Sequence, residues 1–264
     1  MSRRLKIESG LQFYGRIQPR PTLQNLDNVL FPNGLSNNDT IEINASSASG
    51  NSLLLTRLIA QCILPFNHND KEIGGIDARV LLINTNHNFL VSKLINMIMN
   101  ILNEKEIFDS SQVIDNIIKR SLTNLTIINC YSSLHYLLTL KTLDIVISSK
   151  KISLVTIDTI DAYYWEDRKS GGQWTMNSYI KNLLMSVQKH TFHWNNVFIY
   201  TRLNFSKNKS KDSITCVRQP TESRINYRLK LEYCTKKNKH MCSIESHERT
   251  CLIESPINSN KMNC

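Results

Sequence analysis

No stretch of this 264-residue chain holds the roughly eighteen consecutive apolar residues that a membrane-spanning helix needs. The N-terminal residues, MSRRLKIESG, are charged and lack an apolar segment, so we expect no secretory signal. The seven cysteines include no C-x-x-C pair, which indicates reduced thiols. A G-x-S-x-G element is also missing, so a hydrolase of that type has no support. These absences argue against a membrane-spanning, secreted or serine-hydrolase protein.

A metal site is not expected, although cysteine and histidine recur near the C-terminal end. Their spacings are long and irregular, unlike the tight pairs of structural zinc sites. The residues concerned are Cys234, His240, Cys242, His247 and Cys251.

Positive charge is concentrated at both ends of the chain. Of the formal net charge of +10, residues 1–20 contribute five basic and one acidic residue, and residues 203–264 contribute twelve basic and six acidic residues. Residues 21–202 hold fifteen of each sign. A neutral core with basic ends suggests a polyanionic partner, most often nucleic acid. A solvated tail without a partner is the alternative for segments so poor in apolar residues.

Apolar runs of strand type and helix type alternate along the chain. Strand patterns cover residues 40–44, 79–85, 125–130, 152–158 and 195–201. Helical spacing covers residues 53–63, 90–102, 106–120, 133–149 and 177–190. The alternation predicts an α/β fold with a mostly parallel central sheet flanked by helices. Shorter patterns at residues 225–233, 240–245 and 250–254 predict C-terminal antiparallel strands.

The first strand pattern leads into what looks like a degenerate phosphate-binding loop. Residues 41–56 read IEINASSASGNSLLLT, and a strand, a small-residue turn and a helix are the setting of the Walker A pattern G-x-x-x-x-G-K-[ST]. On that pattern Ala45 takes the first glycine, Gly50 the second, Asn51 the lysine and Ser52 the hydroxyl. Ser52 can still ligate magnesium, but Asn51 has no charge to pair with the terminal phosphates. The alternative is a polar serine turn that caps the helix.

The fourth strand pattern, LVTID, ends in the carboxylate of Asp158. In a P-loop NTPase the aspartate in this place helps to hold the magnesium ion. Many buried strands end in aspartate for other reasons. The pattern gains weight here because a strand, loop and helix of Walker A shape precede it by about a hundred residues.

Two basic stretches are candidates for contact with DNA. Residues 163–174, YYWEDRKSGGQW, place aromatic side chains beside Arg168 and Lys169 in a glycine-containing loop, a combination typical of single-strand contacts. Packing of the aromatic rings into the core or a partner is the alternative. The second stretch follows the fifth strand, and its alternative is a loop without a specific partner. Its cations are Arg202, Lys207, Lys209 and Lys211.

Several runs resemble the RecA-like recombinases, specifically their divergent DNA-repair paralogues. The similar runs are Glu8-Ser9-Gly10, AQCILP at 60–65, LLINTNHNF at 81–89, YSSLHYLLTL at 131–140 and IDTIDAYYWEDRKSGG at 157–172. The resemblance covers about residues 5–202. It implies a RecA-like P-loop NTPase core at 37–202, an N-terminal arm at 1–36, and a basic loop with C-terminal strands at 203–264 that complete the same domain.

The resemblance also implies a role. Members of this family act in homologous-recombination repair of double-strand breaks, in hetero-oligomers with other recombinase paralogues. It therefore implies a nuclear protein whose partners are another RecA-like paralogue and DNA, single-stranded or branched, with no membrane.

The chain departs from this family where the chemistry would lie. Asn51 replaces the Walker A lysine, Asn84 and Asn86 replace acidic residues, and the glutamine that senses the γ-phosphate would fall near Leu203. An amide hydrogen-bonds water but cannot take its proton. The losses predict a non-catalytic subunit for which no cofactor is expected, with ATP and magnesium only as weak or structural ligands. The alternatives are a DNA-stimulated ATPase completed in trans by a partner, and a stand-alone DNA-binding protein.

Overall fold

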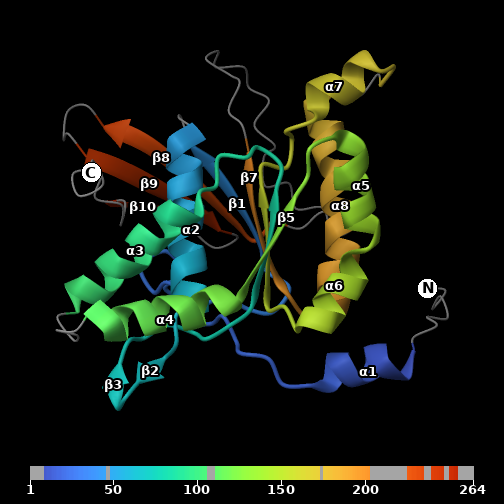
Figure 1. Ribbon diagram of the computed structural model, residues 1–264. Helices are drawn as coiled ribbons and strands as arrows, with labels where there is room; N and C mark the ends of the chain where they lie inside the picture. Colours follow the sequence, from blue (N-terminus) through green and yellow to red (C-terminus); the bar gives the residue numbers. More distant parts are fainter. Residues whose placement is uncertain are drawn as a thin grey trace.

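The strand runs of the sequence meet in one eight-stranded sheet that has helices on both faces (Figure 1). The computed structural model describes residues 9–45, 48–105, 111–172, 175–202, 225–234, 239–246 and 250–254. The strands of the sheet are β1 (Thr40–Ala45), β4 (Val80–Asn84), β5 (Leu125–Asn129), β6 (Leu154–Asp158), β7 (Val197–Arg202), β8 (Tyr227–Cys234), β9 (Lys239–Ser246) and β10 (Thr250–Glu254). The helices are α1 (Gly10–Ile17), α2 (Ala48–Ile63), α3 (Val91–Glu104), α4 (Ser111–Thr123), α5 (Ser133–Lys141), α6 (Leu143–Lys150), α7 (Tyr164–Lys169) and α8 (Met176–Trp194).

The strand order is β10-β9-β8-β1-β7-β6-β4-β5. The pairs from β8 through β1, β7, β6 and β4 to β5 are all parallel, and β9 is antiparallel to both β8 and β10. The predicted α/β class is therefore confirmed, with a RecA-like, mostly parallel sheet and antiparallel strands at its C-terminal end. None of the described helices is both long and apolar enough to cross a membrane.

The inner strands are apolar on both sides because each side faces a helical layer. In β4, Val80 and Leu82 join one buried cluster, whereas Leu81 and Ile83 join the other. The layer of α2, α3 and α4 covers the first cluster, and α5, α6 and α8 cover the second (Figure 1). The sheet thus separates two hydrophobic cores, one on each face.

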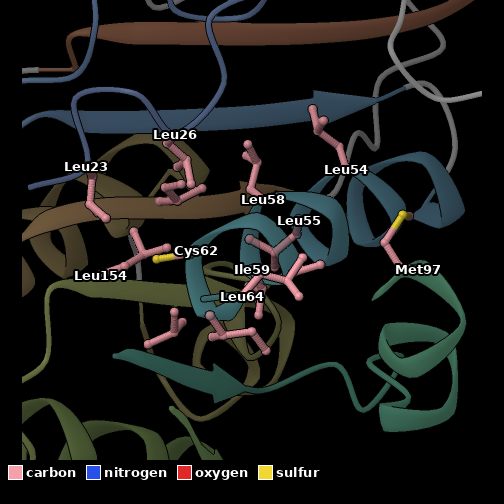
Figure 2. Packing of buried hydrophobic residues seen from close by; sticks show 14 of the residues in the cluster. Leu23, Leu26, Leu54, Leu55, Leu58, Ile59, Cys62, Leu64, Met97 and Leu154 are labelled. Carbon is pink, nitrogen blue, oxygen red and sulfur yellow. The ribbon is translucent and has the colours of Figure 1, made fainter. Parts of the chain in front are cut away.

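The N-terminal arm belongs to the first of these cores. Leu23 and Leu26 of the arm are buried against Leu58 of α2 and Leu154 of β6 (Figure 2). Burying a leucine side chain contributes about 1.5–3 kcal/mol, so this part of the arm is held firmly on the domain. The arm also contains the short helix α1, which contacts α6 of the other layer.

Two local predictions are wrong, and one connection has structure that was not predicted. The helix predicted at 133–149 is two helices that meet at Thr142, whose backbone angles (φ −97°, ψ 7°) depart from helical values. The aromatic stretch predicted as a loop contains α7. The connection after α2 holds a small antiparallel pair, β2 (Asn67–His68) and β3 (Lys71–Glu72).

Candidate functional site

The degenerate loop lies at the carboxyl edge of the sheet, where ligands bind in open α/β folds. Asn44 of β1 pairs with Arg202 of β7, and Asn84 of β4 pairs with Asp158 of β6. The ends of these four strands thus bring the predicted site residues to one edge. Between Ala45, the last residue of β1, and Ala48, the first of α2, lie only residues 46 and 47, which are outside the described part.

Asn51 is inside the first turn of α2 rather than in a loop, because that helix begins five residues earlier than the sequence predicts. Its side-chain Nδ2 donates to the backbone oxygen of Arg202 at 2.7 Å, and the residue is 3% exposed. Gly50 precedes it in the same turn. The position that corresponds to the phosphate-binding lysine is therefore filled by a buried, neutral side chain that joins α2 to the end of β7.

Ser52 and Asp158, the two positions that would hold magnesium, contact each other directly. The Ser52 hydroxyl donates to Asp158 Oδ2 at 3.3 Å, and the Thr201 hydroxyl donates to Asp158 Oδ1 at 2.7 Å. Asp158 is 1% exposed and makes no ion pair with the described residues. Burial raises the pKa of its carboxyl, and hydrogen bonds from Thr201, Ser52 and Thr159 act in the opposite direction. The donor chemistry of this pair fits a magnesium ion, but Asn51 does not fit the phosphates that such an ion accompanies.

The two asparagines in place of acidic residues have different environments. Asn84 is buried, and its amide donates to Asn129 Oδ1 at 2.8 Å while its oxygen accepts from the His87 backbone N–H at 3.0 Å. The nitrogen end of this side chain therefore joins β4 to the end of β5, and the oxygen end shapes the turn after β4. Asn86 is half-buried, and its backbone N–H donates to the Asp158 carbonyl. Neither amide side chain can act as a base and take a proton from water at neutral pH.

The DNA-contact candidates do not all come together. Arg168 and Lys169 lie exposed at the end of α7, and the Arg168 guanidinium lies 5.6 Å from the Trp165 ring centre while it donates to the Tyr164 hydroxyl. Arg202 is half-buried at the end of β7 and donates to Asn177 of α8. Lys207, Lys209 and Lys211 lie outside the described residues.

Sequence reasoning missed the threonine hydroxyls on and near Asp158, those of Thr201, Thr159 and Thr85. Thr85 and Thr159 are both buried, and the Thr85 hydroxyl accepts from the Thr159 backbone N–H at 2.7 Å. The Tyr163 hydroxyl donates to the Cys130 carbonyl, which fastens the start of α7 to the end of β5. Threonine is common at strand ends, so the residue type alone does not mark a site. The hydrogen-bond partners of these threonines become known only from the fold.

An exposed aromatic pair lies at the same edge. The rings of His87 and Tyr131 stack with centres 4.6 Å apart, and Tyr131 is 70% exposed. Leu90 and Val91, at the start of α3, and Trp165 of α7 are exposed as well. Large apolar side chains in water at one edge of a sheet are typical of a surface that another protein covers.

The comparison with known proteins agrees with the resemblance in the sequence. The DNA repair protein XRCC2 of the mouse, Mus musculus, is 31% identical to this chain over 171 residues, which make up 64% of this chain and 57% of that protein. The chain thus spans little more than half the length of this relative. No family model matches. The chain is nevertheless homologous to a DNA repair protein, as the paralogue-like runs predicted.

Proposed function

We propose that this chain is a non-catalytic subunit of a recombinase paralogue complex that acts in homologous-recombination repair in the nucleus. The homology to a DNA repair protein supports the repair role. The buried amide of Asn51 is the observation that carries the non-catalytic role, because it stands where a phosphate-binding lysine would be.

The electrostatics of the site agree with this proposal. A triphosphate needs compensating cations, and hydrogen bonds between charged partners are roughly twice as strong as neutral ones. Asn51 offers a neutral amide, and one of its two N–H donors already binds the Arg202 carbonyl. Asp158 brings further negative charge into a buried place, and among the described residues only hydroxyls donate to its carboxylate. Nucleotide binding is therefore weak, and hydrolysis has neither a base nor a charge-stabilising lysine.

Exposed apolar groups at this edge support the role of a subunit. Tyr131 stacks on His87, with Leu90 and Trp165 exposed on the same edge. RecA-type subunits meet at their nucleotide edges, so this surface is suited to another RecA-like paralogue. In this proposal the edge of the chain still binds a neighbouring subunit, although the residues for ATP hydrolysis are lost.

Hydrolysis assays test the proposal. The purified chain, alone and with a co-expressed recombinase paralogue, is expected to release no more phosphate from ATP than Asp158→Asn does. Co-purification with the paralogue is expected for the unmodified chain and is expected to be lost with Tyr131→Glu. Hydrolysis that Asp158→Asn abolishes would show that the chain is an enzyme.

The contact between Ser52 and Asp158 favours one second candidate, an ATPase that a partner completes in trans. The magnesium-binding pair is present, and a lysine or arginine of the partner would replace what Asn51 lacks. In this case the complex, but not the chain alone, binds ATP tightly, and Ser52→Ala removes that affinity. Equal affinity in the Ser52→Ala complex excludes this candidate.

A further inference from the structure

The layer of α5, α6 and α8 has an unusual outer surface that the proposed function does not use. It lies on one face of the sheet, away from α2, α3 and α4 (Figure 1). The inner sides of its helices form the second core cluster, through buried residues such as Tyr136, Leu140, Ile147 and Leu183. Its outer side carries large apolar side chains in water. They are Leu134, Leu137, Leu138, Ile145, Met185 and Phe192.

These exposed side chains are not scattered singly. Leu134, Leu137 and Leu138 repeat at helical spacing on α5, and Leu134 and Leu138 are 66% and 50% exposed. Met185 and Phe192 repeat on the outer side of α8. Because α8 packs against both α5 and α6, these outer sides look out from one layer. An apolar surface of this kind on a globular domain marks an interaction site.

The exposed formal charges of this layer are all positive. The four lysines of its helices, Lys141, Lys150, Lys181 and Lys189, are all exposed. α8 contains no acidic residue, and the single carboxylate of the layer is Asp144 on α6. That carboxylate accepts from Trp194 Nε1 at 2.8 Å and lies 2.8 Å from His190 Nδ1, so α8 occupies both of its oxygens.

We propose that the surface formed by Leu134, Leu137, Leu138, Ile145, Met185 and Phe192, with the four exposed lysines of the same helices, docks an acidic amphipathic protein segment. Its leucine-like side chains would cover the apolar residues, and its carboxylates would pair with the lysines. The apolar contacts supply affinity, and the charges supply orientation and the rate of encounter.

Nucleic acid fits this surface less well than a protein segment. Phosphate backbones need dense cations, and bases stack on aromatic rings, whereas this surface has more exposed aliphatic side chains than lysines and a single exposed aromatic, Phe192. The inference does not rest on nucleotide binding, and its side chains, on α5, α6 and α8, are different residues from those of the paralogue edge.

Selection from a displayed library of random 16-residue peptides tests the inference on the full-length chain. Enriched peptides are expected to combine aspartate or glutamate with leucine-like residues three or four positions apart. The enriched peptide, labelled with a fluorophore, is expected to bind at least about tenfold more weakly to Lys141→Glu/Lys189→Glu and to Leu134→Ser/Leu138→Ser.

Matched controls lie elsewhere on the molecule. Lys119→Glu on α4 changes an exposed lysine on the opposite layer, and Val29→Ser removes an exposed apolar side chain of the arm. Both are expected to bind the peptide with the affinity of the unmodified chain. Because all variants change exposed residues, we expect their melting temperatures to be unchanged, and this measurement checks that each variant is folded. No enrichment, enrichment of basic peptides, or equal affinity in all variants overturns the inference. So does binding of single-stranded oligonucleotides or anionic vesicles, in place of peptides, that depends on Lys141 and Lys189.

Discussion

The side chain of Asn51 donates through Nδ2 to the backbone oxygen of Arg202 at 2.7 Å, so the first turn of α2 is tied to the end of β7. A lysine at this position would place a cation at a phosphate site. The asparagine instead satisfies a carbonyl at a strand end, and a buried carbonyl without a partner costs free energy. The degenerate loop is thus part of the framework of the domain.

Replacement of this amide should lower stability. We expect Asn51→Ala to reduce the free energy of unfolding by about 1–2 kcal/mol, because a buried hydrogen bond is lost and the Arg202 carbonyl loses a donor. Urea denaturation followed by circular dichroism measures the change. Asn182→Ala, at an exposed position of α8, corrects for the better helix propensity of alanine. Equal free energies of unfolding in the two variants would mean that the hydrogen bond from Asn51 to the Arg202 carbonyl does not stabilise the fold.

Asp158 should make the protein less stable as pH rises. Burial raises the pKa of its carboxyl in the folded state above the unfolded value of 3.8. Its contribution is therefore most favourable below the unfolded pKa and is lost as pH rises through the folded pKa. Asp158→Asn keeps the size of the side chain and removes the charge. We expect it to raise the melting temperature at pH 7 and to leave it nearly unchanged at pH 4.

The hydroxyls around Asp158 define the control for this experiment. Thr201→Val removes the 2.7 Å hydrogen bond that stabilises the ionised carboxylate. We expect it to lower the melting temperature at pH 7 more than at pH 4, the opposite trend to Asp158→Asn. The same pH profile in both variants would contradict a charge effect at Asp158.

Much of the sheet is predictable from the sequence, because buried strands such as 79–85 and 152–158 are mostly apolar runs between turns. Helix faces are less predictable. On α5, Leu134, Leu137 and Leu138 have helical spacing, but so do Tyr136 and Leu140, and it is the second set that is buried. Periodicity identifies a helix with two apolar sides, and only the position of the sheet and α8 decides which side faces inward.

The sequence predicts which residues lie at the candidate site, but not which groups their side chains contact. Ser52 and Asp158 are about a hundred residues apart, and the parallel register places both at one edge, as the strand and loop order predicts. The partner of Asn51 was not predictable, since a backbone carbonyl leaves no mark in the sequence. The partners of Glu42 were not predictable either, because they are side chains of two other strands, Tyr200 of β7 and Arg228 of β8.

The buried pair of Glu42 and Arg228 should be costly to break from one side. Arg228 Nε lies 2.9 Å from Glu42 Oε1, and the Tyr200 hydroxyl donates to Glu42 Oε2 at 2.6 Å. Arg228→Met leaves a buried carboxylate with a hydroxyl only, so we expect a loss of about 3–5 kcal/mol in unfolding free energy. Glu42→Met/Arg228→Met should regain most of that loss. Additive losses in the double variant would show that the two side chains do not act as a pair.

DNA binding through α7 should depend on Lys169, which is exposed at the end of that helix. Fluorescence anisotropy with a labelled single-stranded oligonucleotide at several salt concentrations measures this dependence. If Lys169 contacts a phosphate, Lys169→Glu weakens binding and lowers the slope of log affinity against log salt by about 0.7. Arg168→Ala is expected to act similarly and to change the fluorescence of Trp165, because the guanidinium lies 5.6 Å from that ring. Lys119→Glu on α4 makes the same charge change on another face of the molecule. An equal effect of Lys119→Glu and Lys169→Glu would assign the binding to net charge, and α7 would not be a DNA contact.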